Sequence, residues 1–295
     1  MGKKMLFIYN PRAGKAKIKS KLADIIDVFA RAEYEVTVFP TQGQGDARHI
    51  MENRHRDYDL VVCSGGDGTL DETVTGMMES GFSTPIGYIP AGSTNDFGGS
   101  LSLPKNMVRA AEVIVNGRSF LCDIGSFNED FFVYIAAFGL FTEVSYETEQ
   151  EVKNLLGHLA YVLEGMKRLS SIKSYPMRIS YGDNILVEDF IFGMITNSLS
   201  VGGFKNITGQ NVQLDDGLFE VTLIKRPKNP IELNNILISL MNHKVDMDVM
   251  YCFRTSELIL ESAEPVAWTL DGENGGNHKS VKIENICKGM DIRVK

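Results

Sequence analysis

The sequence lacks the features that mark several broad classes of protein. Its four cysteines lie far apart in 295 residues without a CxxC pair, so we expect buried thiols in a reducing compartment. No apolar run approaches the roughly 18 residues of a membrane-spanning helix, and residues 5–9 are too short for a signal peptide. The net charge of −8 argues against a general nucleic-acid binder. A cytoplasmic globular protein is therefore expected.

The first third of the chain alternates between two kinds of pattern. Short apolar, β-branched runs predict strands, and residues with apolar side chains on one face predict helices between them. The predicted strands are residues 5–9, 35–39, 60–63 and 86–89, and the predicted helices are residues 16–32, 46–53 and 70–80. A βαβα order predicts a doubly wound parallel sheet with helices on both faces.

The pattern changes after about residue 118, where runs separated by turn signals predict a second, mainly antiparallel β-sandwich domain. Its predicted strands are residues 131–137, 177–181, 185–196, 218–224, 257–260 and 266–270, with helices at 149–169 and 230–242. The fold class is therefore an α/β domain at 1–126 followed by a β-rich domain at 127–286. We expect the last strand, 291–294, to return to the first domain, so that 287–295 completes it.

Polar, glycine-bearing segments follow three of the predicted parallel strands. They read NPRAGK at 10–15, SGGDGT at 64–69 and PAGSTNDF at 90–97. Because the carboxyl ends of parallel strands share one edge of a sheet, the three loops should face one cleft. Glycines let backbone N–H groups approach an anion, and a following helix offers its positive end, so the pattern favours phosphate binding. No Walker GxxxxGK[ST] sequence is present.

These three motifs, followed by LDGE at 270–273, resemble the diacylglycerol kinase catalytic family. That family includes bacterial soluble diacylglycerol kinases and related bacterial lipid kinases, and is more distantly similar to NAD kinases and phosphofructokinases. GGDGT is shared by all of these groups, whereas the set of four motifs is specific to the lipid-kinase branch. The resemblance spans almost the whole chain and implies a two-domain, ATP-dependent lipid kinase whose N-terminal domain binds the nucleotide.

The resemblance also implies roles for particular residues. An acidic centre would comprise Asp67, Asp96 and Glu273, with Glu273 as the proton acceptor and Asp271 as a competing candidate for that role. Carboxylates suit Mg²⁺, which phosphoryl transfer needs. Residues expected to line the ATP site are Asn10, Pro11, Arg12, Ala13, Gly14, Thr41, Gly65, Gly66, Asp67, Gly68, Thr69, Leu70, Asp71, Glu72 and Ser93.

A second acidic segment, QNVQLDDGLFEV at 210–221, has two interpretations. The resemblance implies a structural Mg²⁺ held by Asp216 and by the backbone carbonyls of Gln213 and Leu218. The residues alone predict only a hairpin turn at Asp215-Asp216-Gly217. The chain also departs from the family pattern at Asp71, where the usual residue is Asn, and at Ser93, which keeps a hydroxyl in place of the usual Thr.

A lipid substrate would place the enzyme at the inner face of a membrane, where contact must be peripheral because no span is predicted. Two basic segments are candidates for that contact. One holds alternating lysines at 15, 17, 19 and 21, and the other holds Lys225, Arg226 and Lys228. Alternating charges scatter around a helix, so a solvated face is the competing interpretation. Related bacterial enzymes are compatible with a homodimer.

Three functions stay open on these residues. Transfer of the γ-phosphoryl group of ATP to diacylglycerol, giving phosphatidate, is the simplest. A kinase of a sphingoid base, another lipid or NAD is the enzymatic alternative, with NAD disfavoured because PAGSTNDF and LDGE follow the lipid branch. A lipid-binding regulatory protein with a decayed site is the non-enzymatic alternative, against which the intact Asp67, Asp96 and Glu273 argue.

Overall fold

The computed structural model divides the chain into two compact units, residues 1–124 with 288–295 and residues 125–287. The boundaries predicted from the sequence, after residues 126 and 286, lie within two residues of these. The structure describes residues 2–54, 57–81, 84–93, 95–140, 172–198, 200–201, 204–205, 212–242 and 245–295.

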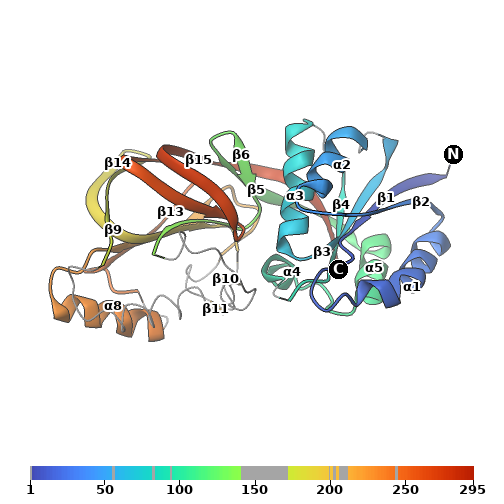
Figure 1. Ribbon diagram of the computed structural model, residues 1–295, viewed down its shortest axis with the longest axis horizontal. Coiled ribbons are helices and arrows are strands. Elements are labelled where there is room, and N and C mark those ends of the chain that lie inside the picture. The colour runs from blue at the N-terminus through green and yellow to red at the C-terminus, as the bar shows by residue number, and fades with distance from the viewer. Residues whose placement is uncertain are drawn as a thin grey trace. The chain divides into compact units, whose positions relative to one another are not determined.

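Unit 1 (residues 1–124 and 288–295) is built on the predicted parallel sheet. Its strands lie in the order β4-β3-β1-β2, and all neighbouring pairs in that order are parallel. Their bounds are β1 Lys3–Tyr9, β2 Tyr34–Pro40, β3 Leu60–Gly65 and β4 Ile86–Pro90. The helices between and after them are α1 Ile18–Arg31, α2 Asp46–Arg54, α3 Asp67–Glu79, α4 Asp96–Ser100 and α5 Met107–Asn116 (Figure 1).

Burial explains why these segments form this unit. Strand β3 is buried at every position, as expected of a central parallel strand covered on both faces. Helix α1 buries Ile18, Ile25 and Phe29 on one face, and the Phe29 ring meets Phe7 of β1 edge to face at 5.6 Å. The end of the chain also joins this sheet, where Ile292 pairs in parallel with Ile86 of β4.

Helix α3 begins three residues earlier than the sequence pattern predicts. Gly66 is its N-cap in an extended conformation, so Asp67, Gly68 and Thr69 form the first helical turn. Glycines at 65, 66 and 68 lower helix propensity, which made this segment resemble a loop. The short helix α4 and helix α5, which Asn106 caps, were not predicted.

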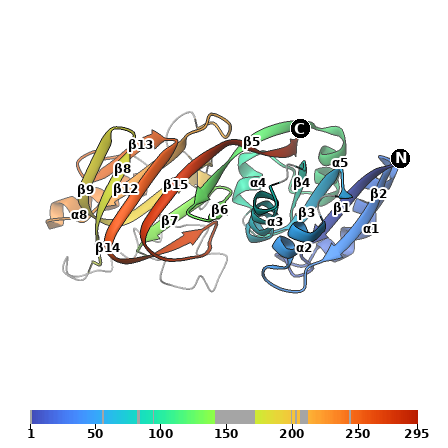
Figure 2. The ribbon, with the colours of Figure 1, turned by 90° about the horizontal axis from the view of Figure 1, so that it is seen from above.

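Unit 2 (residues 125–287) is a mainly antiparallel sheet, as predicted. The order is β13-β12-β9-β7-β14-β15; β8 pairs with both β9 and β14, and β5 pairs with β6 and β15. Figure 2 shows β14 and β15 as long, curved neighbours. One continuous hydrogen-bonded path links these strands, rather than the two separate sheets of a simple sandwich. A two-stranded ribbon, β10 with β11, lies outside that path.

The bounds of unit 2 elements refine the predictions. A single strand predicted at 131–137 is broken into two pieces, whereas two strands predicted at 257–260 and 266–270 are one irregular strand. The helix predicted at 149–169 lies outside the described residues. The elements are β5 Arg118–Phe127, β6 Asp130–Phe132, β7 Ile135–Gly139, β8 Tyr175–Tyr181, β9 Asn184–Thr196, β10 Ser200–Val201, β11 Phe204–Lys205, β12 Phe219–Lys225, α8 Pro230–Asn242, β13 Met250–Thr255, β14 Glu257–Leu270 and β15 Glu273–Val294.

A single aromatic-rich core holds unit 2 together. Trp268 is 1% exposed and lies between Phe127, at 5.0 Å between ring centroids, and Phe138, at 4.9 Å. These three residues come from β14, β5 and β7, so the core joins segments far apart in the sequence. In the described part of the chain, no helix is long and apolar enough to cross a bilayer.

Replacing Phe138 with alanine should destabilise unit 2 by about 3–5 kcal/mol, because it removes a fully buried ring and leaves a cavity beside Trp268. Trp268 is the chain's single tryptophan, so its fluorescence during urea unfolding reports on this unit. Val187→Ala is the matched control, since Val187 is 69% exposed, and its cost should stay within about 0.5 kcal/mol. Equal effects of the two substitutions would contradict this account of the core.

Candidate functional site

The three glycine-bearing loops of unit 1 lie against one another at the carboxyl edge of its sheet. A Cβ atom added to Gly92 would lie 2.5 Å from the Gly66 Cα, and one added to Gly14 would lie 2.5 Å from the Ala91 carbonyl oxygen. Gly14 also has a φ of +52°, which glycine adopts without strain. The loops after β1, β3 and β4 therefore meet, and only glycine fits where they do.

The first loop is tied to the second by a side chain that the sequence singles out. The Asn10 amide donates to the Thr69 hydroxyl at 3.4 Å, and its carbonyl oxygen accepts the Arg12 N–H at 2.9 Å. Thr69 itself lies in the first turn of α3, where a helix presents its positive end. Ala13 is buried, whereas the side chains of Arg12 and Ser93 are exposed and can reach a ligand.

Asp67 is the carboxylate at the centre of this arrangement. Its Oδ2 accepts the backbone N–H of Asp96 at 3.2 Å, so the loops after β3 and β4 bring two of the predicted acidic residues together. Its Oδ1 is buried and has no hydrogen-bond partner among the described residues. Burial raises the pKa of Asp67 to about 6, against the opposing effect of backbone hydrogen bonds from Asp96, Phe97 and Asn95.

The donors present fit a magnesium ion held mostly by phosphate and water. Mg²⁺ takes oxygen ligands, and protein sites for it use one or two carboxylates beside substrate phosphates. Asp67 offers a buried oxygen that accepts no hydrogen bond from the described residues, and Asp96 is a second buried carboxylate beside it. Within the described residues, no group of three or more His, Cys, Asp or Glu side chains forms a ready-made cage.

Several residues predicted to line the nucleotide site make contacts within unit 1 that stabilise its fold. The Glu72 carboxylate accepts the backbone N–H groups of Gly45 at 2.7 Å and Ala47 at 3.2 Å, which ties α3 to the start of α2. Leu70 is 1% exposed and belongs to the core. Thr41 is buried, and its N–H is bonded to the Tyr9 carbonyl at 2.9 Å. Their predicted contacts with ATP stay predictions. Thr94 lies outside the described residues.

In unit 2, the structure gives Asp271 a role that the sequence left open. Its carboxylate accepts three consecutive backbone N–H groups, those of Val133 at 2.5 Å, Tyr134 at 3.0 Å and Ile135 at 2.9 Å. These bonds bend the chain between β6 and β7, which is why the strand predicted at 131–137 is broken. They support the turn-residue interpretation of Asp271 over the role of proton acceptor. Glu273, by contrast, is exposed at the start of β15.

The predicted structural metal site has its carboxylate engaged by protein groups. Asp216 Oδ1 accepts the Leu218 N–H at 3.1 Å, and Oδ2 is paired with the Arg254 guanidinium. Gly217, at φ +77°, completes the predicted turn. The Arg254 Nε also lies 3.2 Å from Oε1 of Glu220, which is buried. Burial raises the pKa of Glu220 to about 7. The guanidinium thus supplies positive charge where the resemblance implies Mg²⁺, and a metal at Gln213, Asp216 and Leu218 stays a prediction.

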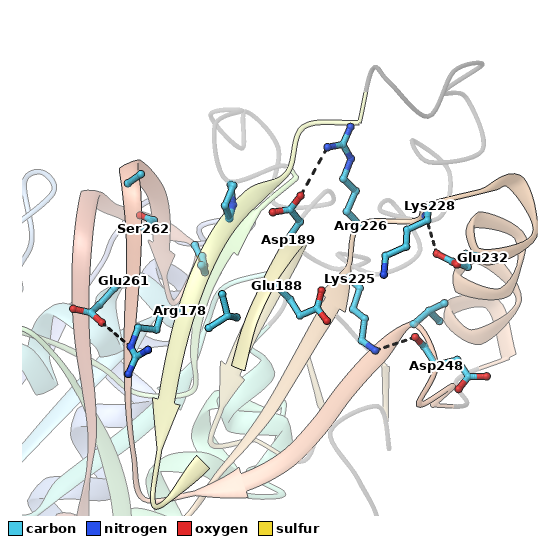
Figure 3. A pocket seen from close by; sticks show the side chains of 15 residues that line it. Arg178, Glu188, Asp189, Lys225, Arg226, Lys228, Glu232, Asp248, Glu261 and Ser262 are labelled. Carbon is cyan, nitrogen blue, oxygen red and sulfur yellow. Dashed lines mark hydrogen bonds and ion pairs between the residues drawn. The ribbon is translucent and has the colours of Figure 1, made fainter. Parts of the chain in front are cut away.

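A pocket of about 740 Å³ lies elsewhere in unit 2 (Figure 3). It is lined by the basic segment proposed for membrane contact, Lys225, Arg226 and Lys228. Arg226 pairs with Asp189 at 3.9 Å, and the Lys225 ammonium donates to the Asp248 carbonyl at 3.0 Å. The lining also holds acidic residues, which offset the positive charge that would attract an anionic surface: Glu188, Asp189, Glu232, Asp248 and Glu261.

Fold and site together define an α/β unit whose glycine-bearing loop edge carries carboxylates, joined to a β-rich unit. Residues 4–127 match the family model described as "Diacylglycerol kinase catalytic domain". A Staphylococcus epidermidis protein named "Diacylglycerol kinase" is 35% identical over 94% of this chain and 87% of its own length. A Staphylococcus aureus protein of that name is 34% identical, covering 94% of this chain and 88% of its own.

The chain belongs to the diacylglycerol kinase family, and that membership makes it a lipid kinase. A solved structure, described as "The crystal structure of a diacylglycerol kinases from Bacillus anthracis str. Sterne", is similar at a TM-score of 0.77. It is 22% identical and covers 100% of this chain and 97% of its own, which supports the fold alone.

Asp271→Ala should destabilise unit 2 by about 3 kcal/mol or more, because three buried amides lose a charged acceptor. Glu273→Gln, two residues away and exposed, should leave the free energy of unfolding within about 0.5 kcal/mol of the wild-type value. Urea unfolding followed by Trp268 fluorescence measures both. An Asp271→Ala variant with the free energy of unfolding of the wild type would contradict the structural role assigned to this carboxylate.

Proposed function

We propose that this enzyme transfers the γ-phosphoryl group of Mg-ATP to the hydroxyl of diacylglycerol, giving phosphatidate. The observation that carries the proposal is Asp67, a buried carboxylate set inside a glycine loop at a helix start, with one oxygen that has no described partner. A carboxylate repels phosphate, so its place there makes chemical sense beside a divalent cation. The names of the relatives supply the lipid.

Backbone groups would hold the nucleotide phosphates. Gly66 and Gly92 let the backbones of two loops approach each other closely, and the first turn of α3 adds its positive end. Arg12, whose side chain is exposed beside Asn10, can reach phosphate oxygens. No lysine is needed in the loop under this arrangement.

Asp67 and Asp96 are the residues that would hold or orient magnesium, directly or through water. When bound, Mg²⁺ offsets the charge of the phosphate oxygens during transfer. Two features of the chain support this role: the Asn10–Thr69 hydrogen bond ties two loops together, and Asp67 Oδ1 accepts no hydrogen bond from the described residues.

Glu273 is our proposed proton acceptor for the lipid hydroxyl. Glu273 is an exposed residue that substrate can reach, and Asp271 is buried and accepts three backbone N–H groups. As the hydroxyl oxygen attacks phosphorus, its proton moves to Glu273 and the bond to ADP breaks. General-base catalysis of this kind contributes about 10²- to 10⁴-fold. Access to a bilayer lipid implies peripheral, transient contact with the inner membrane face.

A panel of acceptors in mixed micelles with labelled Mg-ATP tests the proposal. Diacylglycerol should be phosphorylated with the highest kcat/KM, sphingoid bases should react weakly, and NAD should not react. Phosphorylation of NAD but of no lipid would overturn it. Preference for a different lipid would keep the lipid kinase and replace the substrate.

Asp67→Asn should lower kcat at least about 100-fold while leaving the protein folded. Because the pKa of Asp67 is about 6 in the folded protein against an ordinary 3.8, folding takes up a proton between those values. The ionised carboxylate therefore costs stability above pH 6, and the variant should unfold at a temperature equal to or above that of the wild type at pH 7.5. Unchanged turnover would refute the role of Asp67.

The same carboxylate predicts the acid limb of the pH profile. Its ionised form is needed for metal, so kcat/KM for nucleotide should fall below about pH 6 at low Mg²⁺. Protons and metal compete for Asp67, so raising Mg²⁺ should move this limb to lower pH. The assay is kcat/KM from pH 4.5 to 8 at several Mg²⁺ concentrations. A limb that stays fixed as Mg²⁺ rises would contradict the assignment.

A further inference from the structure

Tyr88, which belongs to none of the sequence motifs, contacts both the loop after β3 and the loop after β4. It is fully buried on β4. Its hydroxyl lies 3.3 Å from the Gly65 carbonyl oxygen, at the start of the GGDGT loop, and 3.2 Å from Asn95 Oδ1, in the PAGSTNDF loop. One O–H group thus has acceptors in both loops and donates to one of them at a time.

Asn95 holds its own loop in shape at the other end of this link. Its Oδ1 accepts the Gly92 N–H at 2.9 Å, and its Nδ2 donates to the Gly92 carbonyl at 2.8 Å. Its backbone is left-handed, at φ +53°, a conformation that Asn tolerates better than most residues. The side chain therefore closes the turn that carries exposed Ser93 and leads into Asp96.

The two loops leave little room for relative movement. The Gly65 carbonyl oxygen also accepts the N–H groups of Ala91 at 2.8 Å and Gly92 at 3.1 Å. On the far side, the Asp96 N–H reaches Asp67 at 3.2 Å. The Tyr88 ring is held as well, since a Cβ atom on Gly98 would lie 3.2 Å from its Cε1. Tyr88 and Asn95 thus lie where the loops after β3 and β4 contact each other.

We propose that Tyr88 is a positioning residue of the nucleotide site: through Gly65 and Asn95 its hydroxyl sets the spacing of the two loops that bind the phosphates. The inference rests on the proposed function. It assigns Tyr88 no contact with substrate, so its effect must appear through the loops. Burial raises the pKa of Tyr88 well above its usual range, with Asp67 and Asp96 adding to the shift, so the hydroxyl stays a protonated donor at assay pH.

Tyr88→Phe removes only the hydroxyl. Both acceptors keep a backbone donor, Ala91 N–H for Gly65 and Gly92 N–H for Asn95, so no buried acceptor is left unpaired. The expected result is a rise of about 3- to 10-fold in the Kd of Mg-ATP, the change that one neutral hydrogen bond supports. The KM for diacylglycerol should stay close to wild type, and the thermal unfolding midpoint should fall by no more than the loss of one hydrogen bond causes.

Tyr34→Phe is the matched control, because Tyr34 lies on β2 of the same unit and packs partly buried against its core. Titration calorimetry of Mg-ATP with wild type, Tyr88→Phe and Tyr34→Phe compares the affinities directly. If Tyr88→Phe binds Mg-ATP as the control does, or if the KM for lipid rises equally, the positioning role is overturned.

A double-mutant cycle with Asn95→Ala tests whether Tyr88 and Asn95 act on nucleotide binding through the same contact. If both residues act through one link, adding Tyr88→Phe to Asn95→Ala should change the Kd of Mg-ATP by less than about 2-fold. Independent, multiplying effects would contradict the link. Wild-type protein that neither binds Mg-ATP nor phosphorylates a lipid would instead overturn the proposed function, so the two failures are distinguishable.

Discussion

A carboxylate buried among backbone amides is the constraint on which the candidate site of unit 1 depends. Asp67 begins α3 yet accepts a hydrogen bond from the backbone N–H of Asp96, so one side chain joins the loops after β3 and β4. The bond satisfies one of its oxygens, and burial raises the carboxyl pKa to about 6. Stability alone would favour an amide at this position, so the charge is explained by chemistry.

Unit 2 uses the same device for the opposite purpose. Asp271 directs its carboxylate at three amides of the segment between β6 and β7. In unit 1, the Glu72 carboxylate likewise accepts two backbone N–H groups at the start of α2. Carboxylates satisfied in this way order the backbone, whereas an oxygen that the protein leaves without a donor is available to a ligand. That distinction separates Asp67 from Asp271, which their positions in the sequence do not.

The sequence predicted the parallel sheet because each strand of unit 1 is a short apolar run. It predicted the edge where the loops meet because carboxyl ends of such strands coincide. It predicted the end of β15, residues 291–294, but not its long polar, glycine-bearing part, which forms a strand by pairing with β14. The role of Asp271 was equally hidden, since its partners lie 136–138 residues away. Tyr88 gave no signal, because a buried tyrosine in a strand is ordinary.

The account's central claim is that glycine backbones bind the phosphates while Asp67 serves the metal. The most direct measurement is the Kd of ATP with and without Mg²⁺ for wild type and Asp67→Asn. Wild type should prefer Mg-ATP, and the variant should lose that preference while binding metal-free ATP as tightly or more tightly, because a repelling charge is gone. If Asp67→Asn weakened the binding of metal-free ATP and of Mg-ATP by the same factor, the claim would be contradicted.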